Sequence, residues 1–375
     1  GASRDGPKGI PLAGGVTVVD KFNGPPHDVG LKYHSGDFEF SASHRMEHYT
    51  APRAGGGGTG QLIDLDAYRE FEGVEPGMQS TFWHSELKYS HNIFDDVALI
   101  LRPYYDEADV VSNEAQARAG ETGTKAGVAK GYTTKTHEIS YGFQSSASKP
   151  YKLGNWGSGD VLCGIQAEQF DVQYSWDIHS PDSTHADYWI GTPAIFPAGK
   201  ETSYAAYTQV KHKLTEQYLL NAGLRYDYKT RLTGLDHVDR GSPRAAFIYL
   251  PNDKLSFRAS YSRSFADAPY RYRYTRLTGG GYTGAATLQP EIMDSYQLSA
   301  EIFGWRSMSH RLNFFYNDFT NGIYRDANGN YLNSGATKIN GVEYEAGIKR
   351  PNLHVRAQFT LQHTLPSSVG YSVQD

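Results

Sequence analysis

The most regular feature of the chain is an alternation of apolar and polar residues over segments of about ten residues. Between Leu353 and Leu361 every odd-numbered residue is apolar and every even-numbered residue is polar, and apolar and polar residues also alternate one by one in the segments 255–261 and 342–346. Successive side chains of a strand point to opposite faces of its sheet. Each such segment therefore predicts a β-strand with one apolar and one polar face. Helical periodicity is nearly absent.

Fourteen segments carry this pattern or a close variant of it. They predict strands at residues 29–34, 37–45, 81–91, 96–105, 132–145, 159–174, 202–214, 217–228, 243–250, 254–264, 292–303, 308–317, 338–349 and 353–363. Brief connections, such as 215–216, alternate with long ones, such as 265–291; only 146–158 is too long for its place as a tight turn. This order is typical of outer-membrane barrels, which have short periplasmic turns and long external loops.

A soluble all-β sandwich or propeller is the alternative, because its strands also alternate. Such folds have no reason to place short and long connections in strict succession. The predicted strands also match a tilted bilayer crossing and exceed the usual strand length of about 5 to 6 residues. We therefore predict an all-β fold, an antiparallel transmembrane β-barrel.

Composition narrows the class of protein further. A mean hydropathy of −0.57 and the lack of long apolar runs exclude helices that span a membrane. The 36 Lys and Arg nearly balance the 41 Asp and Glu, which argues against nucleic-acid binding. The single cysteine, Cys163, excludes an internal disulfide and a zinc site built on several cysteines. It falls on an apolar stripe, where we expect an inert thiol. The 28 Tyr suit the aromatic girdles of a barrel.

The predicted order of turns and loops places both ends of the chain on the long-loop side. Complete bacterial barrels close edge to edge, because an open edge in hydrocarbon leaves backbone groups unpaired. We therefore expect residues 1–28 to form an irregular N-terminal segment or external loop and residues 29–363 to form a partial outer-membrane β-barrel. Residues 364–375 are then the start of a further external loop.

Six short motifs follow one another in the second half of the chain. They are Tyr207-Thr208-Gln209 with Gly223-Leu224-Arg225-Tyr226-Asp227, Ser242-Pro243-Arg244, the strand 255–265, Leu288-Gln289-Pro290-Glu291, Phe315-Tyr316-Asn317-Asp318, and Gly341-Val342-Glu343. Over residues 204–361 the chain thereby resembles the barrel of TonB-dependent outer-membrane receptors. One departure is that Asp267 stands where the family has the Arg of Phe-Arg-Ala-Pro.

The resemblance implies a barrel of about 22 strands around a plug domain. About 14 strands are then present here, and no plug is recognisable. It also implies a location in the bacterial outer membrane and TonB-dependent uptake of a scarce ligand such as a ferric siderophore. The implied partners are outer-membrane lipid and lipopolysaccharide, and the TonB complex through a plug not present in this chain. A passive porin-like channel and a non-transporting structural or adhesive barrel remain alternatives. No nucleophile motif suggests an enzyme.

The loop 265–291 concentrates arginine and tyrosine, which makes it the candidate ligand-binding site. The candidate residues are Tyr270, Arg271, Tyr272, Arg273, Tyr274, Arg276 and Tyr282. Arginine can clamp an anion through its fork of donors, and tyrosine offers flat contact area with a hydroxyl, which suits an anionic, aromatic ferric chelate. The alternative is a loop that only touches lipopolysaccharide or a neighbouring loop.

Two other loops contain possible metal ligands, but neither has the spacing of a metal motif. Loop 175–201 holds Asp177, His179, Asp182, His185 and Asp187 at irregular intervals, as solvated loop residues do. Residues 326–330 begin like a calcium loop, but Tyr331 stands where glycine is required. We expect a turn there, and no metal or cofactor.

Overall fold

The computed structural model describes the chain at residues 10–11, 17–18, 26–50, 77–94, 96–117, 128–180, 190–192, 195–235, 237–275, 284–305, 308–326, 329–333 and 335–366. Within these ranges, no helix is long and apolar enough to cross a membrane. Contacts divide the chain into two compact units. Unit 1 is Gly1–Lys88, Arg102–Phe143 and Glu168–Glu201, and unit 2 is Tyr89–Leu101, Gln144–Ala167 and Thr202–Asp375.

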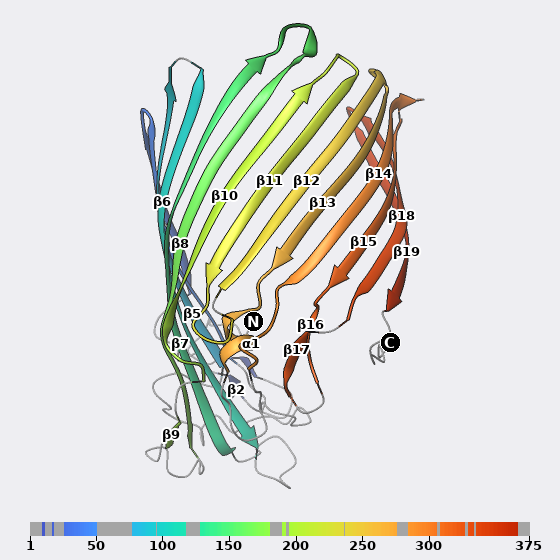
Figure 1. Cartoon of the computed structure of the whole chain (residues 1–375). Coiled ribbons are helices and arrows are strands. Elements are labelled where there is room, and N and C mark those ends of the chain that lie inside the picture. The colour runs from blue at the N-terminus through green and yellow to red at the C-terminus, as the bar shows by residue number, and fades with distance from the viewer. Residues whose placement is uncertain are drawn as a thin grey trace. The chain divides into compact units, whose positions relative to one another are not determined.

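Fourteen strands follow one another through one antiparallel sheet, which confirms the predicted number (Figure 1). They are β3 (His27–Ser35), β4 (Phe38–Thr50), β5 (Gly77–Ile93), β6 (Val97–Ala117), β7 (Val128–Lys152), β8 (Ser158–Ser180), β10 (Gly199–Lys213), β11 (Tyr218–Thr230), β12 (His237–Asn252), β13 (Leu255–Ala266), β14 (Glu291–Trp305), β15 (Met308–Thr320), β18 (Thr337–Arg350) and β19 (Leu353–Pro366). A short strand, β9 (Ile190–Thr192), pairs with β8. Two further hairpins pair β1 (Ile10–Pro11) with β2 (Thr17–Val18) and β16 (Ile323–Arg325) with β17 (Tyr331–Asn333).

Three strands are much longer than predicted. Strands β6, β7 and β8 have 21, 25 and 23 residues. Strand β7 continues to Lys152, so the connection to β8 shrinks to residues 153–157, which contain a 3-10 turn, η1 (Gly154–Trp156). The expectation of an over-long turn at 146–158 was therefore wrong. Backbone pairing continues there without the apolar alternation from which strands are recognised in a sequence.

The two faces of the unit 2 sheet differ in chemistry, as the alternation predicts. One row of paired residues is apolar across seven strands: Leu220, Phe247, Ala259, Leu298, Phe314, Val342 and Leu361. The adjacent row, on the opposite face, is Asn221, Ala246, Ser260, Gln297, Phe315, Gly341 and Gln362. We call these the apolar face and the polar face. Leu298 and Leu361 are each 61% exposed, as expected of side chains whose solvent is hydrocarbon.

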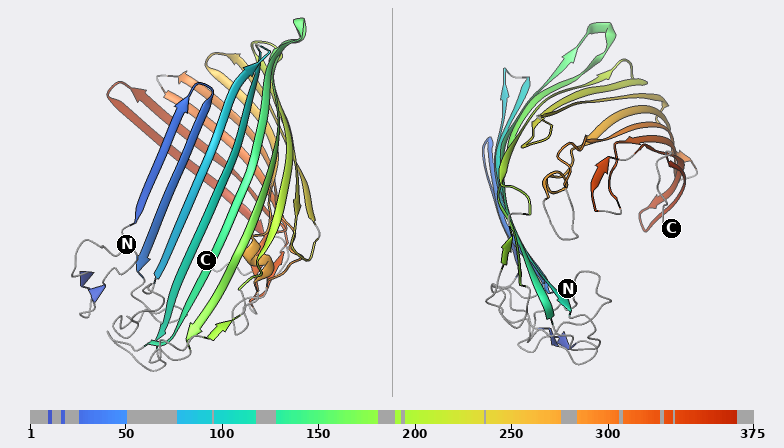
Figure 2. Two further views of the ribbon diagram at one scale, coloured as in Figure 1. Left: turned by 90° about the vertical axis from the view of Figure 1, so that its left-hand side faces the viewer. Right: turned by 60° about the horizontal axis from the view of Figure 1, so that its bottom comes forward.

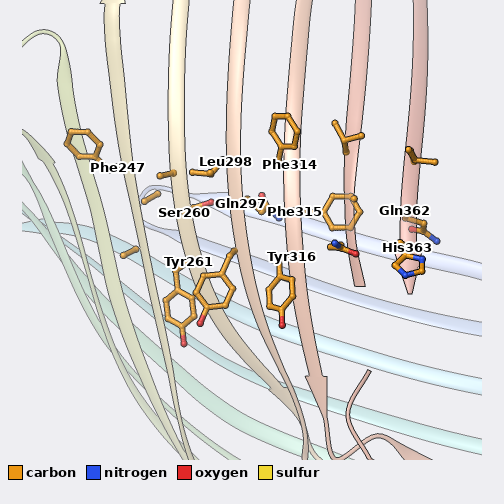
Figure 3. A pocket seen from close by; sticks show the side chains of 18 of the residues that line it. Phe247, Ser260, Tyr261, Gln297, Leu298, Phe314, Phe315, Tyr316, Gln362 and His363 are labelled. Carbon is orange, nitrogen blue, oxygen red and sulfur yellow. The ribbon is translucent and has the colours of Figure 1, made fainter. Parts of the chain in front are cut away.

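A charged row bounds the apolar face on the side of the long loops. The row before it is Ala245, Tyr261, Tyr296, Tyr316, Asn340 and His363, and the charged row itself contains Arg263, Asp294, Asp318 and Lys338. Tyr261 and Tyr316 line the same hollow as the apolar row (Figure 3). The guanidinium of Arg263 donates to both oxygens of Asp294, at 2.9 and 2.8 Å. Aromatic side chains followed by charges mark the edge of the hydrocarbon region.

Several motif residues form cross-strand pairs on the polar face. Phe315 lies directly opposite Gly341, and a Cβ at Gly341 would come within 2.6 Å of the Phe315 ring. Arg244 likewise lies opposite Gly223. Within one motif, the Nε of Arg225 donates to both oxygens of Asp227, at 2.9 and 3.0 Å. These pairs give the motif residues a structural role in the wall.

The long connections of unit 2 pack against the polar face. In Figure 1 the tight turns of this unit lie at the top, whereas α1 (Tyr270–Tyr274) and the β16–β17 hairpin lie at the bottom. The right view of Figure 2 shows both on the concave side of this unit's sheet. The connection between β13 and β14, which carries the candidate residues, is therefore placed over the polar face.

Candidate functional site

Asp267 organises the base of the loop between β13 and β14. Its carboxylate is 3.2 Å from Lys229 Nζ and 3.8 Å from Arg273 Nη2, and it also accepts a hydrogen bond from Arg231 Nη2. The side chain of Arg231 is fully buried and that of Arg273 is 1% exposed. Because buried charges are tolerated only when paired, this cluster fixes the loop to the end of β11.

The charge on Asp267 is well stabilised. Burial by itself would raise the pKa of this carboxyl group, but the nearby charges of Lys229, Arg231 and Arg273 outweigh burial and hold its pKa below the ordinary value. The carboxylate therefore stays ionised at neutral pH. It compensates the buried arginines at the position where the family motif has an arginine instead.

Arg273 and Tyr274 are held within the loop by several contacts. Arg273 donates from Nε to the carbonyl oxygen of Ala268 and from Nη1 to the Tyr274 hydroxyl, both at 2.8 Å. Its guanidinium carbon lies 4.8 Å from the centre of the Tyr274 ring. The Tyr274 oxygen in turn accepts a 3.0 Å hydrogen bond from the backbone N–H of Leu232. Both side chains are therefore held by contacts within the protein.

The neck of the loop is closed by backbone hydrogen bonds. The N–H of Gly284 donates to the carbonyl of Thr275 at 2.8 Å, and the N–H of Ala285 donates to that of Tyr272 at 3.1 Å. Arg271 is exposed, and the ring of the next residue, Tyr272, stacks on Tyr331 of β17 with centroids 4.3 Å apart. The loop thus has an exposed cationic residue next in sequence to a stacked aromatic pair.

A second contact holds the β16–β17 hairpin against the same loop. The side chain of Asn333 accepts a hydrogen bond from the N–H of Gln289 at 2.7 Å and donates to the carbonyl of Gln289 at 2.9 Å. Glu291 accepts the N–H of Ile323 at 2.8 Å. The Leu288-Gln289-Pro290-Glu291 motif therefore joins two long loops, with Leu288 only 2% exposed.

The predicted site residues fall into three groups. Tyr270, Arg273 and Tyr274 are buried, and Arg271 and Tyr272 lie at the loop surface. Arg276 and Tyr282 lie outside the described residues, so their candidate role stays a prediction. Sequence reasoning missed Arg231, Lys229 and Tyr331, which come from other loops and strands. Asp267 at an arginine position was the one signal that opposite charges would gather there.

The weak metal patterns have no converging ligands among the residues that can be placed. Asp177 and His179 pair with β9 through their backbones, and residues 182, 185 and 187 lie outside the described ranges. At the turn expected within 326–330, the N–H of Gly329 donates to the carbonyl of Asp326 at 3.0 Å and the N–H of Asn330 donates to the Asp326 side chain at 2.8 Å, whereas residues 327 and 328 lie outside the described ranges.

Solved structures share this fold at low sequence identity. The ferric-catecholate import receptor Fiu from E. coli K12 gives a TM-score of 0.61 at 13% identity, over 87% of this chain and 55% of that chain. The siderophore receptor PiuA from Acinetobacter baumannii gives 0.57 at 12%, over 90% and 56%. The copper transporter OprC gives 0.61 at 14%, over 89% and 52%. The chain thus spans about half the length of each of these proteins.

No curated protein sequence matches the chain. The family model of the TonB dependent receptor-like beta-barrel, however, matches residues 22–375. Proteins of this family are receptors and transporters of the outer membrane rather than enzymes, which agrees with the apolar and polar faces of the sheet. The chain therefore belongs to the family of TonB-dependent receptor β-barrels and is located in the outer membrane.

Proposed function

We propose that this barrel takes up a ferric siderophore by TonB-dependent transport. The observation that carries the proposal is that exposed Arg271 is next in sequence to Tyr272, whose ring stacks on that of Tyr331. A guanidinium attracts the negative charge of a ferric chelate, and stacked rings offer flat area to its aromatic or planar groups. The cluster around Asp267 holds this surface in place.

The likeness to Fiu and PiuA supports an iron chelate as the ligand, since their names identify a ferric-catecholate import receptor and a siderophore receptor. The copper transporter OprC shares the fold to the same degree, so the fold does not select the ligand. The choice of a ferric chelate rests on the arginine and tyrosine of the loop.

The partners follow from the same proposal. Energy coupling requires the TonB complex, acting through a plug. The apolar face contacts outer-membrane lipid, and the charged row with Arg263 and Lys338 lies at the level of lipopolysaccharide head groups. The assignment of residues 1–28 and 364–375 to external segments around a barrel of residues 29–363 stays a prediction.

A binding titration tests the ligand class. Ferric tris-catecholate, ferric tris-hydroxamate and ferric citrate are added to the detergent-solubilised chain, and quenching of its intrinsic fluorescence is followed. We expect saturable binding of at least one chelate and weaker binding by Arg271→Ala. The matched control is Arg311→Ala, whose arginine pairs with Glu301 on the wall, with Nε and Oε1 2.8 Å apart. Binding of none of the three, or equal losses in both variants, contradicts the proposal.

Bilayer conductance separates uptake from a passive channel. A porin-like barrel conducts ions steadily and shows no saturable ligand binding. A receptor, expressed from its complete gene, should be silent in the same bilayer and should support growth on the bound chelate in iron-starved cells. Open-channel conductance together with absent chelate binding would favour the porin reading.

A further inference from the structure

Three metal-binding side chains meet in unit 1, whereas the ligand loop belongs to unit 2. Glu107 and Asp109 are alternate residues of β6, and His137 lies on the neighbouring β7. Their ligand atoms lie within 4.8 Å of one another. Nδ1 of His137 is 2.6 Å from Oδ1 of Asp109, and its Nε2 is 3.7 Å from Oε1 of Glu107. Among the described residues, no other three His, Cys, Asp or Glu side chains converge in this way.

Two tyrosines orient these ligands. The Tyr105 hydroxyl donates a 2.7 Å hydrogen bond to Oε2 of Glu107, which leaves Oε1 turned toward His137. The ring of Tyr174 stacks on the His137 ring with centroids 5.4 Å apart and planes inclined by 16°. Outer partners of this kind fix the direction of metal ligands and raise affinity.

The cluster lies just past the hydrocarbon-facing stretch of its strands. The residues of β6 that share its face are Val97, Leu99, Leu101, Pro103 and Tyr105, and the charges begin at Glu107. On β7 the same face carries Tyr141 and Ile139 before His137. The three side chains are 17 to 40% exposed, so an ion in water can reach them. A cation there avoids the cost of entering hydrocarbon.

The donor set selects a class of ion. Two carboxylates supply two negative charges, which balance a divalent cation. An imidazole nitrogen disfavours Ca²⁺ and Mg²⁺, which take oxygen ligands, and suits Zn²⁺ and similar first-row ions. Three protein ligands leave positions for water. Ligand atoms around Zn²⁺ stand roughly 3 to 3.5 Å apart, so the cluster needs only side-chain rotation to enclose an ion.

We propose that Glu107, Asp109 and His137 bind one divalent transition-metal ion on the outer surface of the barrel. The ion ties β6 to β7 where both strands extend beyond the membrane. This site is independent of the proposed siderophore uptake, because it lies on the outward face and shares no residue with the ligand loop. The alternative is that no metal binds, and that the strands are joined here by the hydrogen bond between His137 and Asp109 and by the longer contact between His137 and Glu107.

Zinc binding to the full chain distinguishes the two readings. The detergent-solubilised chain is stripped with EDTA and titrated with ZnCl₂ in a calorimeter. We expect one site per chain and a rise of the melting temperature with added Zn²⁺. His137→Ala should lose the site, and Glu107→Gln, which keeps the shape of the side chain, should weaken it at least tenfold. Tyr105→Phe should weaken it by about 10- to 100-fold, as other second-layer changes do.

His84→Ala is the matched control. Nδ1 of His84 is also 2.6 Å from a carboxylate of β6, that of Asp106, but no second carboxylate joins this pair among the described residues. Its loss should leave zinc affinity unchanged. Absence of zinc binding to the unaltered chain overturns the proposal and favours the alternative in which the three side chains join the strands without a metal. Binding that survives both His137→Ala and Glu107→Gln, or that His84→Ala abolishes equally, also overturns it.

Discussion

Removing the carboxylate of Asp267 should release the ligand loop from the barrel wall. The substitution Asp267→Ala leaves Arg231 and Arg273 buried without their counter-charge, with side chains 0% and 1% exposed. Lys229, at 30%, can turn to water and loses less. Breaking a buried ion pair by removing one partner costs about 3 to 5 kcal/mol. The barrel itself does not depend on this cluster, so the loop should open locally while the strands stay folded.

Hydrogen exchange measures this opening directly. The N–H of Gly284 closes the neck of the loop, and the N–H of Leu232 donates to Tyr274. A cost of about 3 to 5 kcal/mol corresponds to exchange that is faster by roughly two to three and a half powers of ten at both amides. Asp239→Ala is the control, because Asp239 is 50% exposed and 3.9 Å from Arg240. Surface pairs contribute about 0 to 1 kcal/mol, so exchange should change less than about fivefold.

The same protection should depend on pH in one direction. The pKa of Asp267 is lower in the folded loop than in an open one, so its contribution is complete above the ordinary carboxyl pKa of about 3.9. Protection should therefore be constant from pH 7 to about pH 4 and fall as the pH drops through the lowered pKa. Exchange in Asp267→Ala that stays within fivefold of the unaltered chain would refute this reasoning.

Three further substitutions test other parts of the account. Tyr272→Ala removes the ring stacked on Tyr331 and should weaken chelate binding by about 2- to 10-fold in fluorescence titrations, whereas Tyr272→Phe should not; equal effects contradict a stacking role. Gly234 has φ 89°, and a Cβ there would lie 2.5 Å from the carbonyl oxygen of Ala286, so Gly234→Ala should destabilise the docked loop by about 1 to 2 kcal/mol or more in hydrogen exchange. Gly241→Ala is the control and should not destabilise it, because the space around a Cβ at Gly241 is open. A larger effect of Gly241→Ala than of Gly234→Ala contradicts the packing. Leu298→Arg on the apolar face should lower the free energy of unfolding, measured by urea titration in lipid vesicles, by about 2 to 4 kcal/mol. Gln297→Arg on the polar face should change this free energy little, and equal losses in the two variants contradict the assignment of faces.

The strands could be predicted because alternate residues face hydrocarbon and water, so that apolar residues alternate with polar ones along the sequence. Leu298 and Gln297 are neighbours in sequence and face different solvents, and that difference is visible in the residues themselves. The ends of β6, β7 and β8 could not be placed, because both faces of a strand beyond the membrane contact water. There the backbone still pairs, but the alternation disappears.

The burial and contacts of the side chains in the ligand loop could not be predicted from the sequence of the loop alone. The concentration of arginine and tyrosine made this loop the candidate ligand-binding site, which stays a prediction, and composition does not separate a buried arginine from an exposed one. Arg273 is buried because Asp267 and Tyr274 surround it, and Arg231 joins them from the end of another strand. Tyr331 likewise stacks on Tyr272 although the two residues belong to different loops. Such contacts depend on which loops are neighbours in space.

The strands cross a membrane with alternate residues facing lipid and water. Nitroxide labels placed singly at residues 295–302 of β14, in the chain with Cys163→Ser, and reconstituted into lipid vesicles, test it directly. Oxygen should relax labels at 296, 298, 300 and 302 most strongly, and a water-soluble nickel complex should relax those at 295, 297, 299 and 301. A period of two in opposite phase is the predicted result. Equal access of the nickel complex to every position would show that neither face of β14 contacts lipid.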